Sequence, residues 1–262
     1  MTVLALPYHL DEYLGEFAFP LQPDTTIIPE LGSGRRWERM TTLYEQLARE
    51  VARVAISGGV EAPVVIETAD CTAALGVVTG LQRAGADALG VAWLDAHGDL
   101  HTPQSSESGY LGGMPLRMLL GEGERAVLER LRLRPVAADR TVLFDGRDLD
   151  PPEEDYLAGS AVHQVPIPDL GAADEAAGVI PSDGPLSLHI DLDVLDDSRL
   201  PGLRYPAPDG PSDRTVTDAA LAIIDTGRVR ALTLSCTWRP PGAEEAGAVA
   251  DLARELRDRL LR

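Results

Sequence analysis

The sequence predicts an α/β protein of three layers, in which helices cover both faces of a mostly parallel central sheet. Two observations lead to this prediction. Short apolar runs typical of buried strands alternate with stretches whose apolar residues recur at helical spacing. Polar motifs follow directly after several of the apolar runs, at the strand ends where such sheets collect their ligands. The 262 residues can build one large core, so we expect a single domain spanning 1–262.

The predicted elements follow the chain in alternation. Strands are expected at 3–6, 63–66, 89–94, 141–144, 162–167, 186–195 and 229–235. Helices are expected at 40–55, 73–84, 215–226 and 244–262, with a helix pair that ends near 131. Residues 8–36 are polar and contain several prolines and glycines, so they are predicted to form a long loop, in which His9 is expected at the surface.

Composition limits the function. The net charge of −19 argues against nucleic acid or an anionic membrane as a partner, and it is compatible with a cationic substrate or with metal ions. The two cysteines cannot form a disulfide framework, which favours a reducing cytoplasm. The first residues lack a basic segment followed by an apolar core, and no run of 18 apolar residues occurs, so we expect a cytoplasmic protein without a membrane span.

The most informative stretch is the apolar run at 89–94 and the motif that follows it, Asp95, His97 and Asp99. Alternate residues of a strand share a face, so these three side chains converge if strand geometry persists. Two carboxylates and an imidazole at the end of a buried strand are costly unless a cation lies between them. A divalent metal site is therefore predicted, and the alternative is a helix-capping aspartate with a surface loop.

A second apolar run, 186–195, carries Asp191 and Asp193 on one face. Buried carboxylates without partners are strongly destabilising, so this pair also favours a cation. His189 shares the face but lies earlier in the run, and it is interpreted as a core histidine with its hydrogen bonds satisfied. Three further aspartates at 145–150 fit either a site or a turn that leads into a helix at Asp150.

Cys71 follows the run at 63–66 and precedes a predicted helix. A helix N-terminus lowers the pKa of a thiol, but from the residues alone a small buried apolar side chain is the simpler interpretation. The polar, glycine-rich segment 100–115 lies next to the predicted site, and loops in that position usually carry substrate recognition.

The motifs resemble those of the ureohydrolase family, which comprises arginase, agmatinase and formiminoglutamase. Residues 95–99 (DAHGD) look like the family's DAHxD motif, residues 191–193 (DLD) like its DxD motif, and 102–113 like the arginase substrate loop. The resemblance implies an arginase-like fold and a hydrolase of linear amidine C–N bonds that uses two Mn²⁺ ions bridged by a water or hydroxide. By resemblance the metal ligands are Asp95, His97, Asp99, Asp191 and Asp193. Asp99 would also be catalytic, orienting the hydroxide and passing its proton to the leaving amine.

Three positions depart from the family pattern. Cys71 stands where the family has a further metal histidine, so the resemblance makes Cys71 a ligand and replaces the interpretation as an apolar residue. A thiolate there would shift the preference toward zinc, iron or cobalt, although the second ion could also bind weakly or not at all. The glutamate that binds the guanidinium in the family falls near Cys236, and Gly112 stands where arginases carry a histidine.

By the same resemblance, His101 and Ser108 would bind the substrate carboxylate, Asp150 its α-amino group, and Cys236 would replace the guanidinium ligand. The expected substrate is a small guanidino or N-hydroxyguanidino amino acid such as arginine or hydroxyarginine, with release of urea or hydroxyurea. Cysteine at position 71 also resembles a sub-branch that acts on Nω-hydroxy-L-arginine. Family members are often trimers or hexamers, so a homo-oligomer is compatible with the resemblance.

Two other functions remain open at this point. A ureohydrolase-like protein that binds metal without catalysis would account for the missing glutamate and histidine. A single-zinc amidohydrolase of the deacetylase type would use a set such as Asp95, His97 and Asp191.

Overall fold

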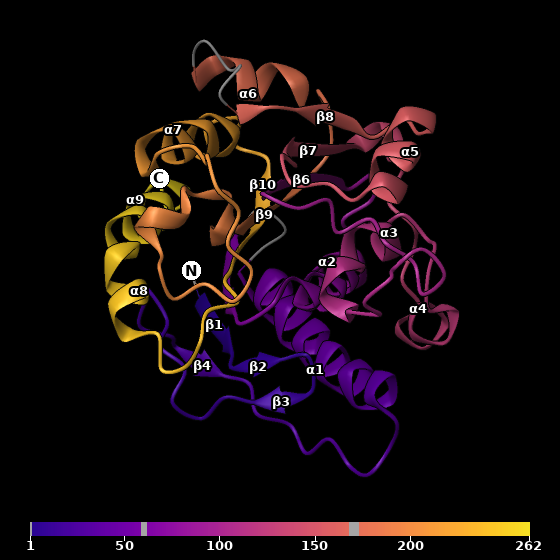
Figure 1. Cartoon of the computed structure of the whole chain (residues 1–262). Helices are drawn as coiled ribbons and strands as arrows, with labels where there is room; N and C mark the ends of the chain where they lie inside the picture. The colour runs from indigo at the N-terminus through magenta and orange to yellow at the C-terminus, as the bar shows by residue number, and fades with distance from the viewer. Residues whose placement is uncertain (1, 59–61, 168–172) are drawn as a thin grey trace.

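The computed structural model describes residues 2–58, 62–167 and 173–262, so residues 1, 59–61 and 168–172 of the predicted domain lie outside the described part. Its centre is an eight-stranded sheet in the order β4-β1-β5-β10-β9-β6-β7-β8, with every neighbouring pair parallel (Figure 1). The strands are β1 Thr2–Leu6, β4 Thr25–Thr26, β5 Val64–Thr68, β6 Gly90–Asp95, β7 Thr141–Asp145, β8 His163–Val165, β9 Leu186–Asp191 and β10 Val229–Ser235. A separate antiparallel pair joins β2 Tyr8–His9 to β3 Glu12–Tyr13.

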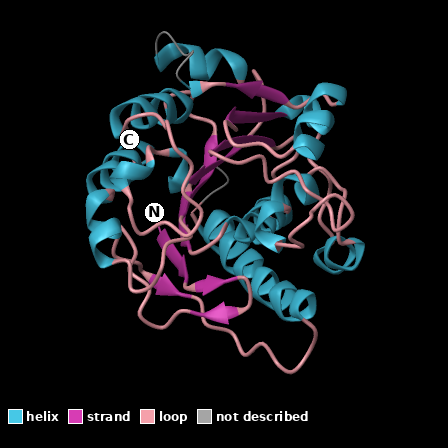
Figure 2. Ribbon diagram, in the orientation of Figure 1, coloured by secondary structure: helices cyan, strands magenta, loops and turns pink. Residues whose placement is uncertain are grey.

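Helices cover both faces of this sheet, as Figures 1 and 2 show, which confirms the predicted three-layer α/β class. The helices are α1 Arg36–Ser57, α2 Ala74–Arg83, α3 Pro115–Leu119, α4 Arg125–Leu131, α5 Pro151–Gly159, α6 Ala173–Val179, α7 Asp213–Ile224, α8 Ala243–Ala248 and α9 Ala250–Leu260. One core lies between the sheet and α1 to α4, and the other lies beneath α6 to α9. No helix in the described ranges is long and apolar enough to cross a bilayer.

The strand register explains how polar residues gather at one edge. Side chains alternate between the two cores, so Trp93 packs beneath α1 and α2 while its neighbour Leu94 packs beneath α7. The carboxyl-terminal residues of the central strands are register partners: Thr68 pairs with Ser235, and Ser235 pairs with Asp191. Asp95 ends β6, the other neighbour of β9, so hydroxyls and carboxylates form a row along the carboxyl edge.

Several boundaries differ from the prediction. The first long helix begins at Arg36, and the C-terminal helix is divided into α8 and α9 at Val249. The strand predicted at 186–195 ends at Asp191 and continues as a short 3₁₀ helix, Leu192–Val194. The segment 8–36 is not all loop, because it contains β2, β3 and the edge strand β4. The helix α6 was not expected, since its seven residues carry little periodic apolar pattern.

The sheet also buries a carboxyl group that the sequence did not single out. Glu67 of β5 is fully buried, and its Oε1 accepts a hydrogen bond from the Leu21 backbone at 2.8 Å. Its Oε2 has no hydrogen-bond partner among the described residues. Burial outweighs this hydrogen bond and raises the pKa of Glu67 to about 8. The side chain is therefore neutral in the folded protein at neutral pH.

We predict that Glu67→Gln makes the unfolding free energy less dependent on pH. Because the folded pKa lies above the unfolded one, the wild type loses stability as pH rises from about 4.5 to 8. The substituted amide keeps an acceptor for the Leu21 backbone and cannot ionise. The difference in unfolding free energy, variant minus wild type, should therefore be larger at pH 9 than at pH 5, on the order of a few kcal/mol. Urea titrations at both pH values measure this difference, and the exposed Glu16→Gln is the control. Equal curves for the wild type and Glu67→Gln would contradict it.

Candidate active site

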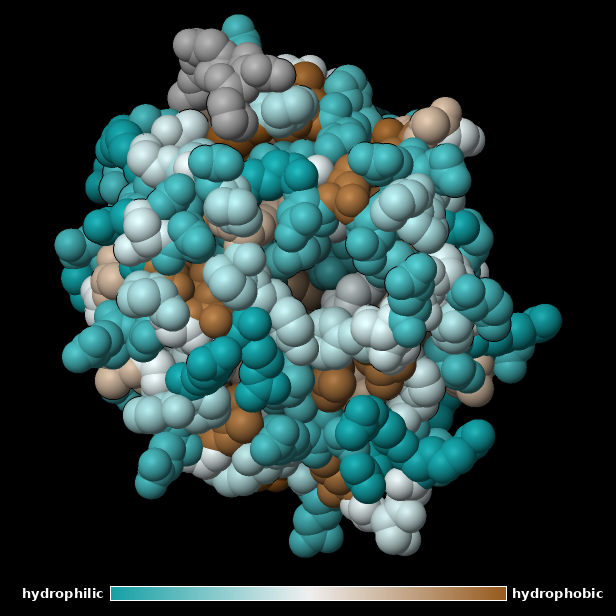
Figure 3. Space-filling view, in the orientation of Figure 1, coloured by the Kyte–Doolittle hydropathy of each residue, from teal (hydrophilic) through white to brown (hydrophobic). Residues whose placement is uncertain are grey.

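A pocket opens at the carboxyl edge of the central strands, and the face of the molecule in Figure 3 is hollowed near its centre. The pocket contains every residue predicted for the site except Cys236. Its lining residues are Cys71, Asp95, His97, Asp99, His101, Ser106, Ser108, Tyr110, Gly112, Gly113, Asp148, Asp150, Glu153, Asp191, Asp193, Tyr205 and Thr237. Among these lining residues there is no arginine, and lysine is absent from the whole sequence. The pocket is strongly acidic and therefore suited to a cation.

A tight turn, not strand alternation, brings the first motif together. β6 ends at Asp95, whose Oδ1 accepts a hydrogen bond from the His97 backbone at 2.8 Å. The His97 ring then lies between two carboxylates, with Nδ1 3.1 Å from Asp193 Oδ2 and 3.4 Å from Asp95 Oδ1. Asp99 takes a left-handed backbone with φ of 53°, which returns its side chain to the pocket. The predicted convergence is observed, but the predicted reason for it was wrong.

The second motif is held by a similar turn and by an arginine. Asp191 Oδ1 accepts a hydrogen bond from the Asp193 backbone at 3.1 Å, and Asp193 Oδ1 accepts one from the Ala96 backbone at 3.4 Å. The Arg147 guanidinium donates to the carbonyl oxygens of Asp193 and of four further residues, which are Val194, Leu195, Ala207 and Pro208. It also pairs with the buried Asp145 carboxylate. Arg147 thus fixes the backbone that carries Asp193.

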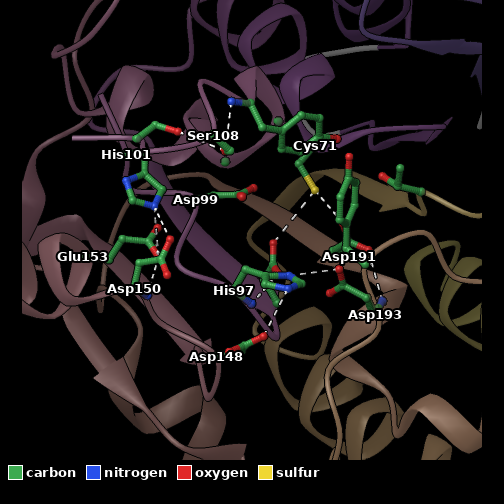
Figure 4. Close-up of a pocket in the computed structure, with 17 residues that line it drawn as sticks. Cys71, His97, Asp99, His101, Ser108, Asp148, Asp150, Glu153, Asp191 and Asp193 are labelled. Atoms are coloured by element: carbon green, nitrogen blue, oxygen red, sulfur yellow. Dashed lines mark hydrogen bonds and ion pairs between the residues drawn. The ribbon is translucent and has the colours of Figure 1, made fainter. Parts of the chain in front are cut away.

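Cys71 lies opposite these aspartates. Asp70 caps the short helix Cys71–Ala73 by accepting a hydrogen bond from the Thr72 backbone, and this cap directs Cys71 into the pocket. The Cys71 Sγ lies 2.7 Å from Asp191 Oδ2 and 3.9 Å from Asp95 Oδ2 (Figure 4). Burial and the neighbouring carboxylates raise the pKa of the Cys71 thiol well above its usual value, so the lowering expected from the helix terminus was wrong.

The electrostatics of the pocket floor favour a bound cation. Burial and neighbouring carboxylates raise the pKa values of Asp99 and Asp191, and raise that of Asp193 to about 6. Burial opposes protonation of His97, but its hydrogen bonds to Asp193 and Asp95 raise the pKa of the ring to about 12. Asp99 Oδ2 is buried without a hydrogen-bond partner in the described structure. This donor set of carboxylate, imidazole and thiol fits divalent metal ions.

His189 lies below this floor and does not behave as predicted. Its ring stacks on Trp93 with centroids 3.7 Å apart, and neither ring nitrogen has a hydrogen-bond partner in the described ranges. Burial lowers the pKa of His189 to about 3, so the imidazole is neutral at pH 7. The predicted core position is therefore confirmed, but the prediction that its hydrogen bonds are satisfied was wrong.

A second polar group, around His101, lies across Asp99 from Cys71 and Asp191, as Figure 4 shows. His101 Nε2 is 3.0 Å from Asp150 Oδ2, and its Nδ1 is 3.2 Å from Ser105 Oγ. Asp150 forms a capping box at the start of α5 with Glu153, whose Oε1 also accepts a hydrogen bond from the Leu100 backbone. Asp150 is thus both the predicted helix start and a pocket residue. The Asp-x-x-Glu spacing was the sequence signal that could have identified Glu153.

Two tyrosines also line the pocket: Tyr110, from the loop at 102–113, and Tyr205, which the sequence did not indicate. Tyr110 and Tyr205 lie with ring centroids 4.8 Å apart, and the Tyr110 hydroxyl is 3.0 Å from His9 Nε2. His9 is buried and also contacts Arg204, so its predicted surface position was wrong. A Cβ at Gly112 would overlap the Tyr110 ring. The tyrosine therefore fills the space that a side chain at position 112 would need.

Cys236 is the predicted site residue that the structure does not bring into the pocket. Its side chain is buried in the core beneath α7 and α9. The next residue, Thr237, lines the pocket instead, and its hydroxyl donates a hydrogen bond to the Ala69 carbonyl. Both cysteines are free.

The Arginase family model matches residues 28–256. The chain belongs to the arginase family. The arginase of Schizosaccharomyces pombe is 32% identical over 197 residues, which cover 71% of this chain and 61% of the yeast protein. The N(omega)-hydroxy-L-arginine amidinohydrolase of Streptomyces lavendulae is 33% identical over 162 residues, covering 62% of this chain and 55% of that protein. The matches therefore span less than two thirds of each relative.

Solved structures of the arginase family share the fold over nearly the whole chain. The arginase of Bacillus cereus superposes with a TM-score of 0.83 at 22% identity and covers 98% of this chain and 96% of its own. The formimidoylglutamase of Bacillus subtilis gives a TM-score of 0.74 at 14% identity, covering 99% and 87%. These similarities confirm the predicted arginase-like fold.

We predict that Arg147→Ala lowers the unfolding free energy by about 3 kcal/mol, because it leaves the buried Asp145 carboxylate unpaired and the carbonyls around Asp193 without a donor. Arg147→Lys should restore little, since one ammonium cannot replace the planar guanidinium fork. Chemical denaturation measures both. The exposed Arg53→Ala, which removes only a surface pair with Glu50, should change stability by less than about 0.5 kcal/mol. Equal losses of unfolding free energy in Arg147→Ala and Arg53→Ala would refute the idea that Arg147 holds the backbone around Asp193.

Proposed function

We propose that this protein is a metal-dependent hydrolase of a linear amidine C–N bond, acting on a guanidino or N-hydroxyguanidino amino acid to release urea or hydroxyurea. The observation that carries the proposal is the convergence of buried carboxylates, a buried thiol and the half-buried His97 imidazole in one pocket of an arginase-family fold. The matched part covers 61% of the yeast arginase, so the activity of this chain is a proposal that rests on the pocket and not on the relative alone.

The metal ligands would be Cys71, Asp95, His97, Asp99, Asp191 and Asp193, and two Mn²⁺ ions are the expected cofactor. When bound, divalent ions supply Lewis acidity and lower the pKa of a coordinated water, which makes a nucleophile at neutral pH. Four aspartates offset the charge of two such ions, and a Cys71 thiolate would add one more negative charge. The thiol must lose its proton to serve as a ligand, so ion binding at Cys71 would release a proton.

Asp99 is the residue best placed to handle protons. It lies between the ligands around His97 and the polar group around His101, facing the space where a substrate would enter (Figure 4). Burial and Asp95 raise the pKa of Asp99 well above its usual value, which suits a group that accepts and returns a proton. In this role Asp99 would hold the attacking water and deliver its proton to the leaving amine.

The outer pocket would bind the amino-acid end of the substrate. Ser108 offers a donor for a carboxylate, and His101 would do so by exchanging its contact with Ser105 or Asp150. The Asp150 carboxylate, 72% exposed, offers an acceptor for an ammonium group. No carboxylate lies at position 236 to grip a free guanidinium. The weaker cation of an N-hydroxyguanidine suits such a pocket, and the hydroxyarginine amidinohydrolase of Streptomyces lavendulae is among the relatives. A cytoplasmic location and a homo-oligomer remain predictions.

We predict that Asp99→Asn lowers kcat for urea or hydroxyurea release by about 10²- to 10⁴-fold, the range for loss of a general acid–base group. A colorimetric assay with arginine and Nω-hydroxy-L-arginine measures the loss. The exposed Asp139→Asn should retain full activity. A wild type that binds metal but releases neither product would favour the non-catalytic alternative, and an Asp99→Asn variant as active as the wild type would overturn the role of Asp99.

We predict that Cys71→His tightens Mn²⁺ binding, because an imidazole suits Mn²⁺ better than a thiolate and adds no negative charge next to Asp191. Isothermal titration of the metal-free wild type and variant measures the change. Cys236→Ser is the matched control, since that cysteine lies outside the pocket and should leave Mn²⁺ affinity unchanged. An unchanged or weaker affinity in Cys71→His would argue against Cys71 as a ligand.

The single-zinc alternative has its own support, because Asp95, His97 and Asp193 offer ligand atoms that all lie within 4.8 Å of one another. A deacetylase-type enzyme would hold one zinc per chain and cleave an amide instead of an amidine. Metal stoichiometry combined with an acetyl-lysine or acetylpolyamine assay separates the two functions.

A further inference from the structure

His189 occupies a position that its chemistry does not explain. It lies in the middle of β9 with Trp93 of β6 and Thr233 of β10 as its register partners. This places it one row beneath the carboxyl-edge row that contains Asp95 and Asp191. It is only 1% exposed, and in the described part of the chain neither ring nitrogen has a hydrogen-bond partner. Burying two polar atoms without partners costs stability unless a ligand pairs with one of them.

Besides Trp93, which stacks on its ring, His189 has two side chains of metal-ligating types nearby, Cys71 and Asp95. A ring nitrogen of His189, the Cys71 Sγ and a carboxylate oxygen of Asp95 all lie within 4.8 Å of one another, and all three residues are buried. Ligand atoms around a tetrahedral zinc are about 3.5 Å apart, which follows from bond lengths of about 2.0–2.3 Å. A shift of about 1 Å in these side chains would therefore bring the three atoms into the first coordination sphere of one ion.

Other groups restrict how this set can be used. Asp95 Oδ2 accepts a hydrogen bond from Trp93 Nε1 at 3.0 Å, and this bond fixes the carboxylate. The same Trp93 ring stacks on His189. Such a hydrogen bond to a ligand orients it toward the metal. The Cys71 Sγ contacts the carboxylates of both Asp95 and Asp191. The three donors thus approach one point from β5–α2, β6 and β9.

We propose that His189 is a metal ligand and forms, with Cys71 and Asp95, a zinc-selective site at the floor of the pocket. The proposal rests on the metal centre of the proposed function and adds to it a ligand that the motifs do not contain. A set of thiolate, carboxylate and imidazole is a normal zinc donor set, whereas Mn²⁺ prefers oxygen donors. The chain would then hold a softer ion at the Cys71 position than at the position of His97 and Asp193.

The competing explanation is that His189 only supports Trp93 and Asp95 by packing. Loss of such an orienting residue weakens metal binding by about 10- to 100-fold but leaves the donor atoms at the metal unchanged. A direct ligand changes both the affinity and the donor atoms. The test therefore needs a spectroscopic readout of the coordination sphere in addition to an affinity.

The experiment uses the metal-free full chain and one equivalent of Zn²⁺ or Co²⁺. Zinc affinity is measured by competition with a chromophoric chelator, for wild type, His189→Gln, His189→Leu and Thr233→Val. We expect both His189 variants to lose more than about 100-fold in zinc affinity. Thr233→Val is the matched control, since Thr233 is the buried register partner of His189 and has no ligand role, and it should stay within about threefold of wild type.

Zinc K-edge absorption and Co²⁺ spectra then read the donor atoms. Wild type should show one sulfur donor and the outer-shell scattering of an imidazole. His189→Leu should keep the thiolate-to-cobalt band and lose the imidazole signal, and Cys71→Ser should lose the band. Intact imidazole scattering in the His189 variants would overturn the proposal, as would zinc affinity within about threefold of wild type.

Thermal unfolding of the same variants, with and without Zn²⁺, checks that they fold. Without metal, His189→Leu removes two unpartnered buried nitrogens, so its Tm should equal or exceed that of wild type. With Zn²⁺, the Tm of wild type should rise and that of His189→Leu should rise much less. Failure of the proposed hydrolase is a separate outcome, since a protein can bind zinc through His189 and still release no urea or hydroxyurea.

Discussion

The rest of the structure depends on one constraint: several buried carboxylates lie together at one edge of the sheet. Asp95 and Asp191 end neighbouring central strands, and Asp193 follows one turn later. Each is buried, so each would prefer to be neutral unless positive charge is nearby. The turns at both strand ends, the His97 ring between two carboxylates and the Arg147 clamp all serve to hold these oxygens in place.

This constraint also explains the residues around the pocket. Cys71 lies against Asp191, and burial together with these carboxylates holds its thiol protonated until a cation takes the place of that proton. Tyr110 fills the space next to Gly112 and packs against Tyr205, and both tyrosines line the pocket. The result is a pocket that combines acidic side chains able to hold a metal with two tyrosines in its lining.

The sequence predicted what depends on local pattern and on motif. Apolar runs placed the central strands, and the Asp95–Asp99 and Asp191–Asp193 motifs marked the edge where the pocket lies. The sequence could not predict that these motifs converge through turns, because the end of a strand depends on its neighbours and not on its own residues. His9, Tyr110 and Tyr205 come from three distant segments, and only the folded chain brings them together. Cys236 illustrates the opposite error. It lies just beyond β10, where neighbouring residues still face opposite sides, so Thr237 lines the pocket while Cys236 is buried in the core.

The central claim is that the floor of this pocket holds divalent metal. Anomalous diffraction from crystals equilibrated with Mn²⁺ and Zn²⁺ tests it most directly, with data collected at both metal edges. We expect anomalous peaks bounded by Asp95, Asp191 and Asp193, with His97 displaced from the two carboxylates that flank it into a ligand position. A map without peaks at saturating metal, in which the His97 ring still bridges Asp95 and Asp193, would contradict the claim.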